Sequence, residues 1–147
     1  KAVRAVSAAQ APAKAPLGLT LDGRRILVVE DEAAVREGLV VLLQSWGAAV
    51  VAFETVAALE SWLGATPDAP RDLLLVAYRL PEGRTGIDAL VLARRRWAQQ
   101  TLPAIIVTGS SLGGHEDEAL RHDYHLLIKP VLPNKLRAMI GFKLGVR

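Results

Sequence analysis

Five short runs of apolar residues, rich in β-branched side chains, recur along the chain between segments of helical periodicity. The runs are apolar on both faces, as expected for strands of a sheet that is covered on both sides. The pattern predicts strands at residues 25–30, 48–53, 73–78, 104–109 and 125–129.

A helix is predicted after each strand, from apolar residues that recur every three or four positions. In the first of these helices, Leu39 and Leu43 continue the apolar spacing and Gly47 follows as a C-terminal stop. Thr55 is suited to be the N-cap of the second helix. The predicted helices span residues 33–46, 55–63, 87–97, 116–122 and 133–144.

This alternation favours an α/β fold, with a parallel sheet covered by helices on both faces. Crossover connections in such sheets are right-handed, which leaves few possible strand orders. Ligands bind beyond the carboxyl ends of the strands in these folds. A functional site is therefore expected at that edge of the sheet.

The first 22 residues differ in character from the rest of the chain. They are rich in alanine and proline, and Pro12 and Pro16 would interrupt any helix there. We interpret residues 1–22 as a linker and residues 23–147 as a single domain. The chain starts at Lys1 rather than at a methionine, so we take it to be a fragment or a processed chain.

The composition is that of a globular protein, with 51% hydrophobic and 22% charged residues. No apolar run is long enough to span a membrane, so no membrane contact is expected in this segment. The absence of cysteine excludes disulfides and thiolate metal sites. It is typical of a reducing compartment, and we expect a cytoplasmic location.

The net charge of +3 and three consecutive arginines at 94–96 raise the question of nucleic-acid binding. Cations at the end of a helix also suit the negative end of the helix dipole and face water. No aromatic residues are interleaved with the arginines to stack on bases. The exposed helix end is favoured, and no nucleic-acid partner is expected.

Chemically useful side chains stand at the ends of the predicted strands. Glu30 and Asp31 follow the first strand, Thr108 lies near the end of the fourth, and Lys129 ends the fifth. Adjacent carboxylates repel each other unless a cation lies between them, and oxygen ligands without sulfur favour Mg²⁺. A hydroxyl and an ammonium group bind phosphoryl oxygens. Together these groups indicate a phosphoryl-binding pocket.

Each of these residues has a simpler interpretation when taken alone. Asp31 can be the N-cap of the next helix, Thr108 a turn residue, and Lys129 an exposed lysine. All of them fall at carboxyl ends of strands, however, and this coincidence favours one shared site.

Four motifs resemble the receiver domains of two-component response regulators, over residues 24–145. "ILVVEDE" is similar to the first strand of the family with its acidic pair, and "IIVTG" to its fourth strand. "LLIKPV" is similar to its lysine and cis-prone proline, and "YRLPEGRTGIDAL" to the segment after the phosphoacceptor. The resemblance implies a flavodoxin-like (βα)5 three-layer sandwich, with a five-stranded parallel sheet of order 2-1-3-4-5.

The same resemblance implies roles for the site residues. Glu30, Asp31 and the backbone carbonyl of Arg79 would bind Mg²⁺, while Thr108 and Lys129 would contact the phosphoryl group. The partner would be a histidine kinase or a histidine phosphotransfer domain. "LLIKPVLPNKLRAMI" and the Ala/Pro-rich lead-in are similar to receivers fused behind the kinase core of hybrid sensor histidine kinases. The parent protein is then expected to be such a kinase, and this chain alone to have no enzymatic activity.

Ala77 departs from the family pattern, because it stands where the family has the aspartate that accepts the phosphoryl group. That aspartate is both the nucleophile and a Mg²⁺ ligand, so Mg²⁺ is expected to bind weakly here. Tyr78 is expected to face the other side of the strand, and Glu82 and Asp88 follow in the loop and helix. As written, the chain is not expected to be phosphorylated.

Two explanations of Ala77 remain open. One is a natural pseudo-receiver, a phosphorylation-independent module for protein interaction or dimerisation through the fourth helix, fifth strand and last helix. Its apolar area would come from Leu132, Leu136, Met139 and Phe142. The other is a recent or deliberate Asp→Ala change in a competent receiver, which the retained strand-end residues favour. A flavin protein or phosphatase on the same fold is disfavoured, because no glycine-rich phosphate loop follows the first strand.

Two further positions bear on signalling. The family often has an aromatic switch residue three positions before the lysine, where this chain has Leu126, and Tyr124 is out of register. Coupling of phosphorylation to the surface is therefore not expected to follow the usual route. The three histidines, His115, His122 and His125, have no metal-binding spacing and are interpreted as surface or partly packed residues.

Overall fold

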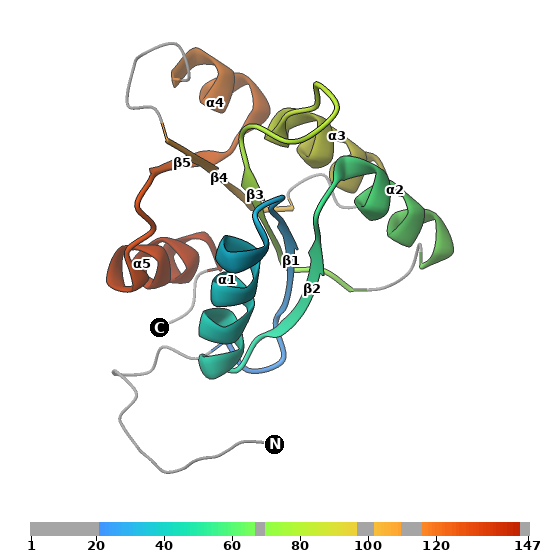
Figure 1. Ribbon diagram of the computed structural model, residues 1–147. Coiled ribbons are helices and arrows are strands. Elements are labelled where there is room, and N and C mark those ends of the chain that lie inside the picture. Colours follow the sequence, from blue (N-terminus) through green and yellow to red (C-terminus); the bar gives the residue numbers. More distant parts are fainter. Residues whose placement is uncertain (1–20, 67–69, 97–101, 110–115, 145–147) are drawn as a thin grey trace.

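The computed structural model describes residues 21–66, 70–96, 102–109 and 116–144. In these ranges five parallel strands form one sheet of order β2-β1-β3-β4-β5 (Figure 1), which confirms the predicted flavodoxin-like order. Each strand lies within one residue, at either end, of its predicted bounds. The strands are β1 (Arg25–Val29), β2 (Ala49–Phe53), β3 (Leu73–Ala77), β4 (Ala104–Thr108) and β5 (His125–Ile128).

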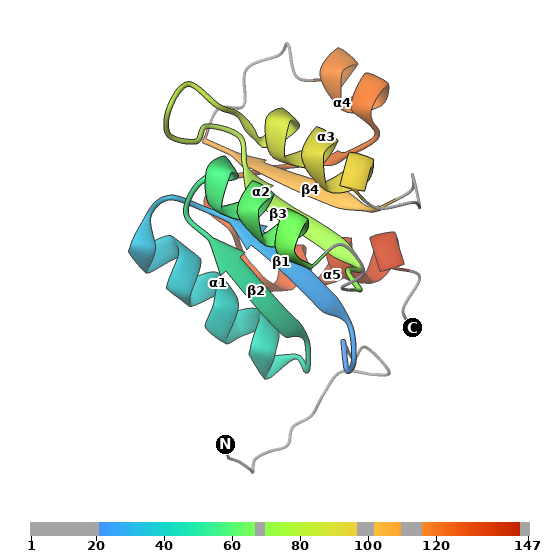
Figure 2. The ribbon, with the colours of Figure 1, turned by 90° about the vertical axis from the view of Figure 1, so that its right-hand side faces the viewer.

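Helices cover both faces of the sheet and complete three layers. Helices α1 and α5 pack on one face and α2 and α3 on the other, with α4 next to α3 (Figures 1 and 2). The helices are α1 (Ala33–Ser45), α2 (Val56–Ala65), α3 (Gly86–Arg96), α4 (Glu116–His122) and α5 (Pro133–Leu144). The predicted end of the third helix at Trp97 lies outside the described residues.

The strand side chains divide between two apolar cores, because successive residues of a strand point to opposite faces. Leu74 and Val76 of β3 belong to the core beneath α2 and α3, whereas Leu73 and Leu75 belong to the core beneath α1 and α5. Every residue of β3 and β4 is buried. This two-sided burial is the reason why the strands appear in the sequence as continuous apolar runs.

The predicted helix boundaries around β2 are confirmed. The Thr55 hydroxyl accepts a hydrogen bond from the Ala58 amide at 3.0 Å, as an N-cap does. Gly47 has a φ of 99°, which a residue with a side chain rarely adopts, and its amide donates to the Gln44 carbonyl at 2.9 Å. The chain therefore turns sharply between α1 and β2.

Residues 1–20 of the predicted linker lie outside the described residues. Leu21, at the end of that segment, is 1% exposed, and its amide donates to the Trp46 carbonyl at 3.0 Å. The division of the chain at residue 22 stays a prediction. Among the described helices, none has the length and apolar character needed to cross a membrane.

Candidate functional site

The strand-end residues that the sequence singled out meet at one edge of the sheet. Val29 pairs in register with Val76, Ala77 with Val107, and Thr108 with Ile128. The three central parallel strands and β5 therefore end together, and Glu30, Ala77, Thr108 and Lys129 come to the same rim. The Lys129 amide donates to the Thr108 carbonyl at 2.8 Å, which ties the ends of β4 and β5.

Glu30 is the buried member of the acidic group, with 3% of its surface exposed. Its carboxylate accepts a hydrogen bond from the Glu32 amide at 3.1 Å. Burial raises the pKa of Glu30, and this effect outweighs the Glu32 hydrogen bond and the charge of Lys129, which both lower it.

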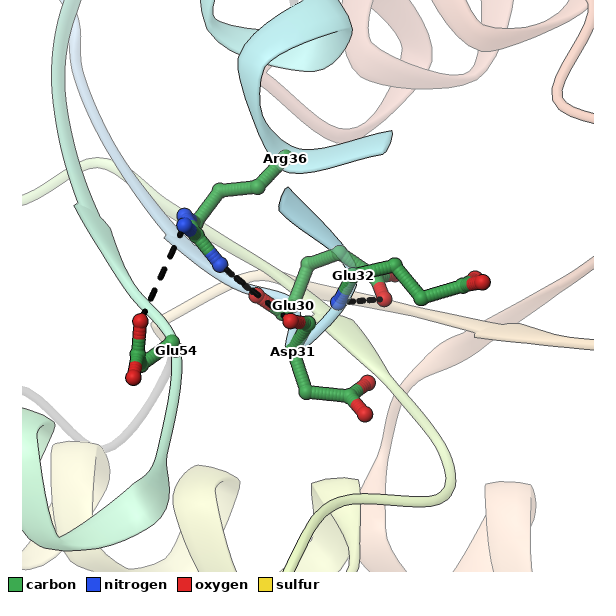
Figure 3. Close-up of polar contacts among 5 residues, drawn as sticks. All are labelled: Glu30, Asp31, Glu32, Arg36 and Glu54. Carbon is green, nitrogen blue, oxygen red and sulfur yellow. Dashed lines mark hydrogen bonds and ion pairs between the residues drawn. The ribbon is translucent and has the colours of Figure 1, made fainter. Parts of the chain in front are cut away.

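Asp31 and Glu32 are exposed, and the Asp31 carboxylate lies close enough to that of Glu30 to add to the upward shift of the Glu30 pKa (Figure 3). The Glu32 carboxylate lies 3.8 Å from the Lys129 ammonium group. Lys129, which was predicted to face a phosphoryl oxygen, therefore already has an acidic partner. Both side chains are more than a third exposed, so water and salt screen the pair and its attraction is weak.

Arg36, on the first turns of α1, holds the backbone of the acidic segment in place (Figure 3). Its guanidinium donates to the Glu30 carbonyl at 2.9 Å and to the Asp31 carbonyl at 3.4 Å, and lies 3.8 Å from the Glu54 carboxylate. The sequence reasoning missed this residue. Arg36 could have been found from its spacing, because it is a cation that follows the acidic end of the first strand by about one helical turn.

Ala77 is the last residue of β3 and is 6% exposed. The chain leaves β3, makes a bridge between Arg79 and Thr85, and returns so that the Gly86 amide donates to the Tyr78 carbonyl at 2.7 Å. A Cβ atom on Gly86 would lie 2.7 Å from the Ala77 carbonyl oxygen. The start of α3 is thus packed directly on the backbone of position 77.

Replacement of Gly86 by alanine should destabilise the domain, because the clashing atom belongs to the backbone and cannot rotate away. We expect Gly86→Ala to lower the free energy of unfolding by about 2 kcal/mol, measured by urea denaturation. Gly38→Ala is the matched control, since a Cβ there meets nothing within 4 Å. That change lies inside α1 and should raise stability by roughly 0.5–1 kcal/mol. Equal effects of the two changes would contradict the close approach at Ala77.

Tyr78 packs against the apolar core that contains Leu74 and Val76, the side on which strand alternation predicts its side chain. Its hydroxyl donates to the Glu118 carboxylate at 3.1 Å. The Tyr124 hydroxyl lies 3.4 Å from the same oxygen. Sequence reasoning missed this connection between the end of β3 and α4. Leu126, at the family's switch position, is half-buried against the same core.

Tyr124 gives the fold a pH dependence in the alkaline range. Burial, reinforced by the charge of Glu118, raises the pKa of Tyr124 from 10.0 to about 12. Between these values the unfolded chain loses the phenolic proton while the folded chain keeps it, so stability falls as the pH rises. We expect this residue to account for a loss of about 2 kcal/mol across that window. Urea denaturation at stepwise pH should show a shallower decline for Tyr124→Phe than for the unchanged chain, and identical slopes would contradict the assignment.

The strand-end acids do not complete a metal site. In the described part of the chain, no group of three or more His, Cys, Asp or Glu side chains is placed to bind an ion. Ala77 contributes no oxygen ligand from its side chain. This donor set does not fit a tightly held Mg²⁺ ion, which prefers ionised oxygen ligands in octahedral geometry.

The fold and the rim define an α/β domain with acidic, hydroxyl and ammonium groups at the carboxyl ends of its strands. The family model of the response regulator receiver domain matches residues 26–141. The chain therefore belongs to the response regulator receiver domain family.

Relatives occur in two kinds of signalling protein. The chain is 32% identical to the phosphate regulon transcriptional regulatory protein PhoB of Klebsiella pneumoniae, over 80% of this chain and 50% of PhoB. It is 31% identical to the sensor protein TorS of Escherichia coli strain K12, over 92% of this chain and 14% of TorS. The chain thus spans at most half the length of these relatives.

A solved structure with the same fold is the receiver domain of the sensor histidine kinase PA1611 from Pseudomonas aeruginosa PAO1. The two share 23% sequence identity with a TM-score of 0.70, over 84% of this chain and 98% of that domain. That structure holds a magnesium ion in its active-site cleft. The similarity supports the fold of the present chain.

The structure brings together Glu30, Asp31, Ala77, Thr108 and Lys129 at one rim, as the strand ends predicted. Arg79 lies in the loop directly after β3. The Lys129–Pro130 bond is cis, as its motif indicated. The functional roles of these residues stay predictions. Of the three histidines, His115 lies outside the described residues.

Proposed function

We propose that this receiver domain does not accept a phosphoryl group, because its acceptor position holds Ala77. The observation that supports this proposal is the placement of Ala77 at the carboxyl end of β3, beside the rim that carries Glu30, Thr108 and Lys129. A methyl group has no lone pair with which to attack phosphorus. In our proposal the residues around it are those of a phosphotransfer site that lacks its nucleophile.

The other strand-end groups are those that would support phosphoryl transfer if position 77 held an acceptor. Lys129 would neutralise charge on the transferred group, and Thr108 would donate a hydrogen bond to it. Glu30, Asp31 and the Arg79 carbonyl would bind Mg²⁺ weakly, because position 77 adds no third carboxylate. In this proposal the chain lacks the acceptor but keeps the residues that would support transfer to it.

The direct test is treatment of the chain with acetyl phosphate and Mg²⁺, followed by intact-mass measurement. We expect no gain of a phosphoryl group. A stoichiometric gain that survives as an acyl phosphate would overturn the proposal, because it would require a different acidic residue to act as acceptor.

The parent protein is proposed to be a hybrid sensor histidine kinase. Receiver domains interact with histidine kinases or phosphotransfer domains, and a sensor protein, TorS, aligns with 92% of this chain. The partner would then be a histidine kinase or a histidine phosphotransfer domain, on the cytoplasmic side. Mixing the chain with a phosphorylated phosphotransfer domain should yield a complex without transfer.

A second candidate function is a phosphorylation-independent interaction or dimerisation module. Of the four residues predicted to supply its apolar surface, Leu136 is buried and Met139 packs against the core. Leu132 and Phe142 are 54% and 75% exposed. Leu120 on α4 is 82% exposed. These apolar side chains, on α4, on α5 and directly before α5, favour contact with a protein surface.

If this face forms a dimer, Leu120→Glu together with Phe142→Glu should convert it to a monomer. The reason is that two carboxylates would be buried without partners in the interface. Sedimentation velocity measures the change, which we expect to be a loss of at least tenfold in dimer affinity. Val41→Glu is the control, since Val41 is 66% exposed on α1, a helix that the proposed face does not include. A monomeric unchanged chain at high concentration would contradict the dimer.

A further inference from the structure

A surface hollow lies near the segments that precede β4 and β5, whereas Ala77 is at the carboxyl end of β3. It has a volume of about 390 Å³ and is formed between α3 and the end of α4, which lies next to α3 (Figure 2). Its lining includes the apolar residues Leu90 and Val91. The hollow is therefore separate from the strand-end site described above.

Basic side chains form the remainder of the wall, with a single acid among them. Arg94 and Arg95 come from α3, and Arg121 and His122 from the last turn of α4. Asp123 follows α4 and is the acidic lining residue. Three guanidinium groups against one carboxylate leave the hollow positive, and such a concave basic surface concentrates anions.

Arg94 fixes the shape of this hollow. Its guanidinium donates to the Leu102 carbonyl at 3.1 Å and 2.8 Å and to the Asp123 carbonyl at 2.7 Å, and also to the His122 carbonyl. These contacts join α3, the segment before β4 and the segment before β5. The acceptors are neutral carbonyls, and the nearby Asp123 carboxylate offsets part of the Arg94 charge.

Arg95 and Arg121 are exposed and are available to a ligand. Within the ranges that the structure describes, neither forms an ion pair with a carboxylate. A guanidinium presents a planar fork of N–H donors that matches the oxygens of a phosphate group. One such fork comes from α3 and the other from α4, and both belong to the lining of the hollow.

We propose that this hollow binds an organic phosphate of about nucleotide size. Arg95 and Arg121 bind the phosphate oxygens, and the partly exposed Val91 contacts the apolar part of the ligand. The volume of about 390 Å³ falls in the range of roughly 300–1,000 Å³ that is typical of small-molecule sites. The combination of fixed positive charge and an apolar wall favours an organic phosphate over a bare inorganic anion.

Isothermal titration calorimetry of the chain at constant ionic strength tests this site with three probes. We expect saturable binding of ADP with one site per chain, weaker binding of pyrophosphate, which lacks an apolar part, and no binding of citrate. Arg95→Gln and Arg121→Gln should each weaken ADP binding about tenfold, since each removes charge-assisted hydrogen bonds. Lys135→Gln, at an exposed lysine of α5, is the matched loss of charge and should leave ADP affinity unchanged.

Three results would overturn the proposal. They are the absence of saturable ADP binding, equal weakening by Lys135→Gln and by the two arginine variants, and citrate binding as tight as that of ADP. The first and third use the unchanged chain and so do not depend on the folding of any variant. The proposal also stands apart from phosphoryl acceptance at position 77, because no residue is shared between the two sites.

Discussion

Ala77→Asp is expected to become phosphorylated by acetyl phosphate, whereas the unchanged chain stays unmodified. In the variant a carboxylate oxygen attacks phosphorus, the bond between phosphorus and the acetyl oxygen breaks, and acetate leaves. The new side chain arises at the carboxyl end of β3, at the rim shared with Glu30, Thr108 and Lys129. Intact-mass measurement should show the gain of a single phosphoryl group.

Two further variants test the role of the acceptor carboxylate and the role of the neighbouring Lys129 charge one at a time. Ala77→Asn has nearly the same size and shape as the aspartate variant but lacks an ionised oxygen, so it should remain unmodified. Addition of Lys129→Gln to Ala77→Asp should slow labelling about a hundredfold, because the positive charge that stabilises the transferring group is lost. Labelling of the asparagine variant, or no labelling of Ala77→Asp in a folded protein, would contradict the assigned position.

Mg²⁺ binding should respond to the same change. A carboxylate at position 77 provides the third acidic ligand that the described residues lack. Calorimetric titration is expected to show tighter Mg²⁺ binding by Ala77→Asp than by the unchanged chain and by Ala77→Asn. Equal affinities would place the metal elsewhere.

Arg94→Leu is expected to lower the free energy of unfolding by about 3 kcal/mol. The substitution leaves the carbonyls of Leu102, His122 and Asp123 without the guanidinium donor that now binds all three. Hydrogen bonds to a charged donor are each worth roughly 1.5–3 kcal/mol, and the apolar stem of the arginine is largely replaced by leucine. Urea denaturation followed by circular dichroism measures the effect.

The neighbouring residue supplies the control for this prediction. Arg95 is exposed and forms no ion pair within the described ranges, so Arg95→Leu should change the free energy of unfolding by at most about 0.5 kcal/mol. Both changes replace an arginine by a leucine, at adjacent positions of α3. Similar losses from both would show that the contacts of Arg94 do not brace the fold.

The strands and helices could be predicted because burial follows the alternation of the sheet and the helical repeat. The five strands are continuous apolar runs for the physical reason that both faces of the sheet are covered. The convergence of Glu30, Thr108 and Lys129 followed from one rule, that parallel strands end at a common edge. The family resemblance added the strand order.

Side-chain partners could not be predicted in the same way. The sequence indicated a solvated helix end at Arg94–Arg96, but Arg94 is tied to carbonyls that lie up to 29 positions further along the chain. Tyr78 meets Glu118 across 40 positions. Such contacts depend on loop paths and side-chain rotamers, for which neither periodicity nor spacing holds information.

The pairing of Lys129 with Glu32 has a consequence for the acidic segment after β1. Lys129 and the Glu32 amide offset part of the repulsion among its three consecutive acidic residues. In our proposal, in which position 77 accepts no phosphoryl group, Lys129 therefore keeps a structural partner at the rim. Such a pairing allows the lysine to be retained in a domain that does not transfer phosphoryl groups.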